Sequence, residues 1–296
     1  MKKIDVHIHS SMWKKTQLQP HCVLASPEEL RESYDGLGIE KGIFMPLISP
    51  EYRFSVQTNE EAEYLSHKYP DLFWWCCNID PRMGENNAKT DFSYFLNYYK
   101  ERGALGVGEL TTNIYTDDPL LDNFFHHCAM CDMPVTIHIA HKKYDTYGII
   151  DDLHLPRLEK MLKKYPDLKI IGHSMCFWSE IDGAVTDAER SGYPTGKVRE
   201  GRVSELMRHY PNLYCDLSAG SGFNALSRDP DFAYRFIEEF SDRLMFATDI
   251  CAPHQEAPLS AWLDDAEKNG LISYNNYAKI CRENAIRIFK ISEEEK

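Results

Sequence analysis

Short apolar runs recur along this chain at a spacing that few folds can accommodate. Eight such runs are separated by longer amphipathic segments, and their ends lie about 30 to 40 residues apart, the length of one strand plus one crossover helix. This alternation is typical of a parallel sheet. The eight runs are Ile4–His9, Lys41–Pro46, Leu72–Asn78, Leu105–Glu109, Val135–His138, Lys169–His173, Leu213–Asp216 and Leu244–Asp249.

The length of the chain favours closing these units into one barrel. A (β/α)8 (TIM) barrel typically needs about 250 residues, and this chain has 296. The composition supplies enough apolar residues for one large core and no Pro/Gly/Ser-rich stretch long enough to be a linker. We therefore expect an α/β fold in which residues 1–296 form a single (β/α)8 barrel domain.

Signals for helix boundaries fall between the predicted strands. Ser26–Glu29 combines a capping hydroxyl, a proline at the first helical position and acids in the first turn, and Asp229–Asp231 repeats this order. A Tyr-Pro-(Asp/Asn)-Leu sequence begins at Tyr69, Tyr165 and Tyr210, just before three predicted strands. Because proline stops a helix, each copy predicts the end of a helix and the turn into the next strand.

Charge and cysteine content limit the classes of partner. A formal net charge of -13 argues against a polyanion partner, because phosphate contacts need clustered Lys and Arg. The nine cysteines are scattered, and the first residues lead into the first predicted strand without a signal-peptide segment, which favours the cytoplasm. No apolar run approaches the roughly 20 residues that cross a bilayer. We expect a cytoplasmic protein with a small-molecule substrate and neither nucleic acid nor membrane as partner; homo-oligomer formation stays open.

Side chains able to bind metal end several predicted strands. They are His7, His9, Glu109, His138, His173 and Asp249. The carboxyl ends of the strands of a parallel barrel meet at one mouth, so these side chains are expected to lie together. Imidazoles and carboxylates suit zinc or a related divalent ion. The sequence therefore predicts a divalent metal centre, with Zn²⁺ as the expected ion.

The first predicted strand carries two of these ligands. Because successive side chains of a strand alternate between its faces, residues two apart share a face. One face carries Asp5, His7 and His9, and the other carries Ile4, Val6 and Ile8. The apolar face can meet the helices, which would leave both imidazoles in the barrel mouth.

The chain resembles the amidohydrolase superfamily, and in particular its amidohydrolase-related group of (β/α)8 metal-dependent hydrolases and decarboxylases. The resemblance follows the family's order through the motifs Asp5–His9, Gly106–Leu110, Ile137–His138, Ile171–Ser174 and Phe246–Asp249. It implies that His7, His9 and Asp249 bind a first metal, that His138 and His173 serve a second metal or the substrate, and that Glu109 takes a bridging position. No lysine ends the fourth predicted strand, unlike the branch that uses a carboxylated lysine there, so one ion or two stays open.

Three functions follow from such a site. The first is a metal-dependent hydrolase that activates water to cleave a small amide, lactone or ester, with Asp249 as proton shuttle and His173 free to act on the substrate if it is not a ligand. The second is a metal-dependent decarboxylase of an aromatic or unsaturated carboxylic acid. The third is a non-catalytic barrel that binds a metal or ligand. Glu109 favours hydrolysis, because a bridging carboxylate helps hold two metals and a nucleophilic hydroxide.

Two arginines are candidates for binding an anionic substrate. Arg228 follows a glycine-rich stretch after the seventh predicted strand, where such barrels often bind phosphate, and Arg82 follows the third strand. A structural role for each arginine stays open. The long segment Ser174–Glu200 follows the sixth strand, and its aromatic residues either cover the mouth as a lid or pack beneath it.

Overall fold

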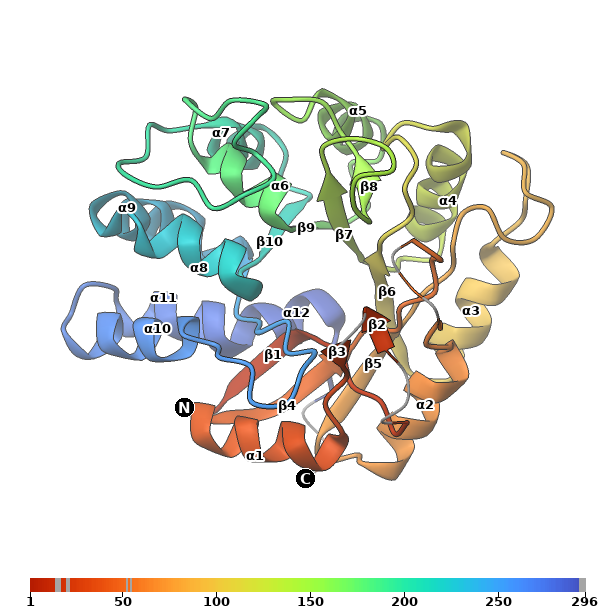
Figure 1. Ribbon diagram of the computed structural model, residues 1–296, viewed down its shortest axis with the longest axis horizontal. Helices are drawn as coiled ribbons and strands as arrows, with labels where there is room; N and C mark the ends of the chain where they lie inside the picture. The colour runs from red at the N-terminus through yellow and green to blue at the C-terminus, as the bar shows by residue number, and fades with distance from the viewer. Residues whose placement is uncertain (14–16, 20–21, 52, 54, 293–296) are drawn as a thin grey trace.

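Strands form a ring at the centre of the molecule, with helices around it (Figure 1). The computed structural model describes residues 1–13, 17–19, 22–51, 53 and 55–292. The strand order is β1-β4-β5-β6-β7-β9-β10-β11, and a parallel bridge between Ile8 and Ile250 returns the last segment to the first strand. The fold is therefore the (β/α)8 barrel predicted from the sequence.

All eight predicted strands are present. The barrel strands are β1 (Lys3–Ile8), β4 (Ile39–Phe44), β5 (Phe73–Cys77), β6 (Ala104–Leu110), β7 (Val135–Ala140), β9 (Ile170–His173), β10 (Leu213–Asp216) and β11 (Leu244–Met245). Strand β11 is shorter than the predicted Leu244–Asp249, but its continuation stays bonded to β1, since Asp249 N donates to His7 O at 2.9 Å. Three short strands complete the set: β2 (Gln17–Gln19), β3 (Cys22–Val23) and β8 (Ile149–Ile150).

The two helices predicted from capping signals begin at Pro27 and Pro230, as expected. Ser26 caps α1 in a capping box with Glu29, and Gly38 ends that helix in a left-handed conformation. The α-helices are α1 (Pro27–Leu37), α2 (Asn59–Lys68), α3 (Ser93–Glu101), α4 (Pro119–Met130), α5 (Pro156–Lys164), α6 (Met175–Trp178), α7 (Arg202–His209), α8 (Ala219–Ser227), α9 (Pro230–Phe240), α10 (Leu259–Lys268), α11 (Tyr274–Ala278) and α12 (Asn284–Phe289). Of the helices described, none is long and apolar enough to cross a membrane.

The Tyr-Pro repeat marks three equivalent points of the fold. Tyr69, Tyr165 and Tyr210 are the C-terminal cap residues of α2, α5 and α7, and a barrel strand follows each within a few residues. Their φ angles agree, at -125°, -121° and -122°. The proline that follows disfavours a helical conformation at the tyrosine, which explains why each helix ends there.

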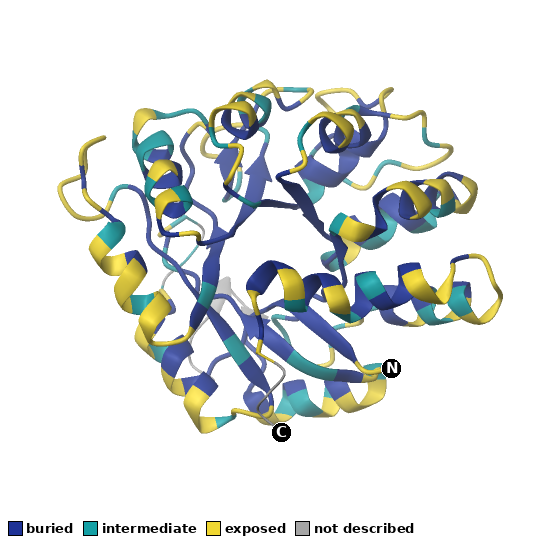
Figure 2. Ribbon diagram, turned by 180° about the vertical axis from the view of Figure 1, so that it is seen from behind, coloured by how far each residue is buried: buried dark blue, intermediate teal, exposed yellow. Residues whose placement is uncertain are grey.

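Most strand residues are buried, whereas the helices expose their outer faces (Figure 2). One cluster of buried side chains joins residues from six strands or their extensions with α12, and such a set can meet only inside the ring. It contains Ile4, Val6, Ile43, Met45, Cys76, Ile171, Tyr214, Met245, Ala247, Ala285, Ile288, Phe289 and Ile291. A larger cluster joins the strands to the surrounding helices.

The predicted faces of the first strand are wrong for its N-terminal half. Ile4 and Val6 face the barrel interior, whereas Asp5 accepts a hydrogen bond from the Tyr34 hydroxyl of α1 at 2.9 Å. The register between β1 and β4 shifts between Asp5 and Ile8. Such an irregularity changes the face on which later side chains lie. It brings His7 into the interior, although on a regular strand His7 would share a face with Asp5.

Candidate metal centre

The six predicted metal ligands come together at the carboxyl end of the barrel. His7 and His9 come from β1 and its end, Glu109 from β6, His138 from β7, His173 from β9, and Asp249 from the segment after β11. Three sets could each hold an ion, and one of them, His7, His173 and Asp216, shares one histidine with each of the other two. The first ligand group is His7, His9 and Asp249, and the second ligand group is Glu109, His138 and His173.

Donor atoms of the first ligand group have the spacing of a metal site. The Nε2 atoms of His7 and His9 are 3.1 Å apart, and Asp249 Oδ1 lies 3.8 Å from the first and 3.4 Å from the second. Glu109 Oε2 lies 3.8 and 3.7 Å from the same two nitrogens. Ligands at about 2.05 Å from a tetrahedral zinc ion are about 3.3 Å apart, so the three donor atoms of the first ligand group are spaced for one ion, with Glu109 Oε2 close to both imidazoles.

The hydrogen bonds of the two imidazoles leave both Nε2 atoms for a cation. His9 Nδ1 lies 2.8 Å from the carbonyl oxygen of Met45, which only accepts, so this nitrogen carries the proton. His7 Nδ1 lies 2.6 Å from the carboxylate of Asp216 and donates in the same way. Two Nε2 lone pairs would repel each other at 3.1 Å, and a proton or a metal ion between them removes that repulsion.

Glu109 connects the two ligand groups. While its Oε2 faces His7 and His9, its Oε1 lies 2.6 Å from His138 Nδ1 and 3.6 Å from His173 Nε2. The distance to His138 is that of a direct charge-assisted hydrogen bond and is shorter than the spacing of two ligands on one ion. A second ion that used both of these atoms would have to replace that bond.

Asp216 is a site residue that was not among the predicted ligands. It is fully buried at the end of β10, bonds to His7 Nδ1, and accepts from the backbone N–H of Ser218 at 2.7 Å. The Ser218 hydroxyl in turn lies 2.9 Å from His173 Nδ1. A signal was available, because Asp216 ends the seventh predicted strand as His173 ends the sixth.

Asp5 ties the two strands that carry the first ligand group. Its carboxyl group accepts from the backbone N–H groups of His7 and Thr248, from the Thr248 hydroxyl at 2.5 Å, and from Tyr34. It is fully buried, and burial raises its pKa to about 7 although all four hydrogen bonds oppose that change. Four donors on one carboxyl group hold β1 against the segment that ends in Asp249.

The imidazoles and carboxylates of the site shift each other's pKa values. Burial disfavours the charged form of His7, but the charge and hydrogen bond of Asp216, with Asp249 and Glu109, outweigh it and raise its pKa to about 10. Burial raises the pKa of Asp216, yet the nearby charges of His7 and His173 bring it below its ordinary value. Burial and the charge of His7 lower the pKa of His173, although the charges of Asp216, Glu109 and Asp249 oppose that change.

The two arginines predicted to bind substrate have acidic partners. Arg82 pairs with Asp80 and Glu51 at 2.7 and 2.6 Å. Arg228 follows the last residue of α8 and lies 3.4 Å from Asp182. Since α8 starts next to the site at Ser218 and spans nine residues, its far end is about 13 Å away. The structure does not bring Arg228 to the ligand groups.

The aromatic residues of Ser174–Glu200 divide into two kinds. Phe177 and Trp178 are buried, and Trp178 Nε1 donates to the carbonyl oxygen of Asp216 at 2.9 Å, so both pack beneath the segment. Tyr193 is half-exposed, and its ring lies against Gly220 in the first turn of α8. Burial, and to a lesser extent the charge of Asp249, raises the pKa of Tyr193.

A different arginine borders the site. Arg53 follows β4, and its guanidinium lies 5.4 Å from the ring centre of Tyr147, which itself lies 4.5 Å from the His138 ring. It donates to the Thr111 hydroxyl at 3.2 Å, while its buried Nε has no hydrogen-bond partner among the described residues. Burial lowers the pKa of Arg53, and the negative charge of Glu109 opposes that change.

Comparison with known proteins identifies the family. The family model described as Amidohydrolase matches residues 4–291, so the chain belongs to the amidohydrolase family, as its motifs predict. The class is thus that of metal-dependent (β/α)8 enzymes. No curated protein matches the sequence.

Several solved structures share the fold at low sequence identity. A 2,6-dihydroxybenzoate decarboxylase from Rhizobium is 17% identical over 98% of this chain and 99% of its own, with a TM-score of 0.61. A probable 2-pyrone-4,6-dicarboxylic acid hydrolase from Acinetobacter baumannii is 15% identical over 98% and 100%, with a TM-score of 0.60. A 5-carboxyvanillate decarboxylase from Novosphingobium aromaticivorans, complexed with manganese, is 19% identical over 98% and 96%, with a TM-score of 0.63.

Proposed function

We propose that this protein is a metal-dependent hydrolase of a small amide, lactone or ester. The observation that carries the proposal is the position of Glu109, whose two oxygens face the two ligand groups. His7, His9 and Asp249 would hold the ion, with Glu109 as a fourth or bridging ligand. When bound, a divalent ion lowers the pKa of water and polarises a carbonyl oxygen.

Asp249 and His173 are the proposed proton-transfer residues. Asp249 Oδ1 faces the first ligand group, while its Oδ2 lies 3.8 Å from His173 Nε2. The Asp249 side chain keeps 25% of its surface exposed, so it can reach a substrate. Nearby imidazole charges hold its pKa below the ordinary value despite burial, and the ionised carboxylate can accept a proton from water and return it to the leaving group.

The proposed substrate is anionic, and Arg53 would bind its charge. A guanidinium nitrogen that is buried without a partner gains most from a carboxylate or similar group. The neighbouring Tyr147 ring offers an apolar surface between this cation and His138. Arg82 and Arg228, the arginines predicted from the sequence, remain predictions; Arg82 pairs with two carboxylates, and Arg228, although two of its buried nitrogens also have no partner among the described residues, lies at the far end of α8.

Decarboxylation is the second candidate. It is favoured by the direct bond between Glu109 and His138, which engages one oxygen of Glu109 and leaves a single complete set of ligands. The manganese-bound structure with the same fold is named a decarboxylase, which adds to this alternative. In this reaction Asp249 and His173 would move protons to and from the substrate without attack by water.

Metal analysis and labelled water test the proposal. We expect Zn²⁺ in the purified protein, and hydrolysis in ¹⁸O-labelled water to place the label in the acid product of a carboxylated lactone or ester. Release of CO₂ from an aromatic acid, with one ion per chain and no label in the product, would instead support the decarboxylase. Failure of the protein to take up any divalent ion would refute both functions.

A further inference from the structure

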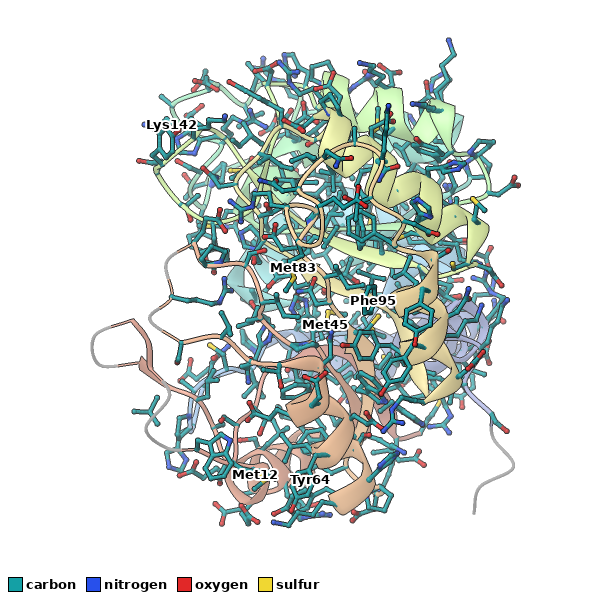
Figure 3. The ribbon with its side chains drawn as sticks, turned by 90° about the vertical axis from the view of Figure 1, so that its right-hand side faces the viewer. Met12, Met45, Tyr64, Met83, Phe95 and Lys142 are labelled. Carbon is teal, nitrogen blue, oxygen red and sulfur yellow. The ribbon has the colours of Figure 1, made fainter. Side chains whose placement is uncertain are left out.

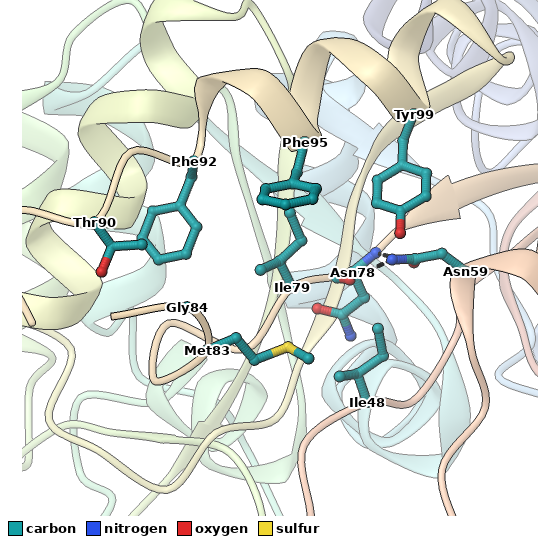
Figure 4. A pocket seen from close by; sticks show the side chains of 10 residues that line it. All are labelled: Ile48, Asn59, Asn78, Ile79, Met83, Gly84, Thr90, Phe92, Phe95 and Tyr99. Atoms are coloured by element: carbon teal, nitrogen blue, oxygen red, sulfur yellow. Dashed lines mark hydrogen bonds between the residues drawn. The ribbon is translucent and has the colours of Figure 1, made fainter. Parts of the chain in front are cut away.

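A cavity of about 220 Å³ lies between helix α3 and the segments that follow β4 and β5 (Figure 4). No residue of the two ligand groups lines it, so it is separate from the candidate metal centre. Its walls are mainly apolar and aromatic. The apolar side chains are Ile48, Ile79, Met83, Phe92 and Phe95.

The cavity has a buried floor and an open rim. Ile79 and Phe92 are buried, whereas Met83 and Phe95 are 49% and 51% exposed and stand at the surface beside α3 (Figure 3). A small molecule can therefore enter between these two side chains. For comparison, an engineered apolar cavity of about 150 Å³ binds benzene, so this one has room for an aromatic ring with a short substituent.

One wall carries a buried hydrogen-bond acceptor without a partner. Asn78 Nδ2 donates to the carbonyl oxygens of Pro46 and Glu109 at 2.8 and 2.7 Å. Because carbonyl oxygens only accept, this pair of bonds fixes which end of the amide is nitrogen. The other end, Oδ1, has no hydrogen-bond partner among the described residues, and Asn78 is 1% exposed.

Asn78 is held rigidly in this position. Its backbone N–H donates to Asn59 Oδ1 at 2.7 Å, and its carbonyl oxygen accepts from Asn59 Nδ2 at 2.9 Å. Figure 4 shows these paired bonds, with the Asn78 amide between Ile48 and Met83 on the cavity side. A buried polar atom without a partner is unfavourable, and a ligand that donates to it removes that cost.

We propose that this cavity is a second ligand site, which binds a small aromatic molecule that carries one hydrogen-bond donor. The ring packs against Ile79, Met83 and Phe95, and the donor bonds to Oδ1 of Asn78. Because the Asn78 side chain also bonds to the backbone of Glu109, one residue, Asn78, connects the ligand to the second ligand group.

A matched pair of probes tests both parts of the site. 1-Phenylethanol has an aromatic ring and a hydroxyl donor, whereas acetophenone has nearly the same shape and only accepts. Titration of the intact protein, followed by ligand-observed NMR, should give a Kd about fivefold lower for the alcohol, the value of one added hydrogen bond. Equal affinities for the two probes, or no binding of the alcohol at millimolar concentration, would overturn the proposal.

Variants locate the binding. Ile48→Phe fills the cavity and Phe95→Ser removes part of its rim, and each should weaken binding of 1-phenylethanol at least about tenfold. Tyr94→Ser is the matched control, because Tyr94 lies on the same helix, is 69% exposed and does not line the cavity; its effect should stay within about twofold. Circular dichroism checks that each variant folds.

The metal centre is the competing location for the probe. His9→Ala removes a ligand of that centre and leaves the cavity intact, so it should bind 1-phenylethanol as the unmodified protein does. Loss of binding in His9→Ala together with normal binding in Ile48→Phe and Phe95→Ser would show that the alcohol binds at the metal centre, and the proposal would be wrong. Hydrolytic activity does not enter this test, so the proposed function is judged separately.

Discussion

The two sides of the candidate metal centre are supported differently. On the side where β1 meets the last segment, each imidazole of the first ligand group donates its Nδ1 proton to a buried acceptor outside the group. On the opposite side, Glu109 and His138 bond to each other. The imidazoles of the first group are therefore oriented before any ion arrives, and the ion has to displace only the proton between them, whereas in the second group it has to replace the bond between Glu109 and His138.

Residues outside the first ligand group orient its histidines before a metal ion binds. Asp216 at the end of β10 and Met45 just after β4 fix the orientation of His7 and His9, and Asp5 ties β1 to the segment after β11. Partners of this kind commonly change metal affinity 10- to 100-fold. We expect the first ligand group to bind its ion more tightly, and the predictions below test this order.

Removing one ligand from each side of the site should give the largest effects on metal binding. The effects of the two substitutions should also differ most. His9→Ala should weaken binding of the first ion by more than about 100-fold, beyond the range of outer partners, and abolish activity. His138→Ala should leave one ion bound with little change in affinity. Chelator competition and elemental analysis measure both. Similar losses in the two variants would contradict the proposed difference between the sides.

Removal of the Asp5 carboxyl group should destabilise the fold where the first ligand group is built. Asp5→Ala leaves four buried donors without an acceptor, and we expect the free energy of unfolding to fall by about 3 kcal/mol. Tyr34→Phe removes only one of these donors and should cost about 1 kcal/mol. Urea denaturation of both variants provides the measurement, and a small loss in Asp5→Ala would argue against this role.

Asp216→Asn should reduce metal affinity 10- to 100-fold while leaving the fold intact, because the amide cannot provide the negative charge that supports His7. Ser218→Ala, which removes the hydroxyl beside His173, is the control on the same segment and should affect metal affinity less. Both values can be obtained by competition with a coloured chelator. An unchanged metal affinity in Asp216→Asn would contradict the proposed role of this carboxylate in binding of the first ion.

Metal binding should strengthen as the pH rises. In the metal-free protein the pKa of His7 is raised to about 10, so its Nε2 carries a proton at neutral pH that the ion must displace. Between about pH 7 and pH 10 the apparent affinity should rise about tenfold per pH unit, with one proton released per ion. Calorimetry in buffers of different ionisation enthalpy measures that proton. Affinity independent of pH would exclude a protonated His7.

The smallest expected effects concern substrate binding, and they should differ between an arginine at the mouth and an arginine at the far end of α8. Arg53→Gln should raise the KM for an anionic substrate about tenfold with little change in kcat, because it removes a charge-assisted hydrogen bond. Arg228→Gln should change KM less than about twofold, since Arg228 pairs with Asp182 about nine helical residues from the site. Steady-state kinetics on one substrate compares them, and the reverse order would restore Arg228 as the substrate residue.

Much of this site could be predicted because its ligands end strands. A side chain at the carboxyl end of a strand reaches the mouth of a parallel barrel almost regardless of exact register, which is why all six predicted ligands meet. The helix ends at Tyr69, Tyr165 and Tyr210 were predictable for a local reason, the proline that follows each of them. These features depend on a few neighbouring residues and not on the rest of the fold.

Tertiary structure alone decided the remaining details. The register shift in β1 separates Asp5 from the histidines and brings His7 inward, and simple alternation along the strand could not show it. The pairing of His7 with Asp216 spans 209 positions, and the distance of Arg228 from the site depends on the length and direction of α8. Which elements form and which strand ends carry ligands could be predicted, because both depend on local periodicity. Which side chains contact each other depends on closure of the barrel, because contacts between residues far apart in the sequence depend on every strand in the ring.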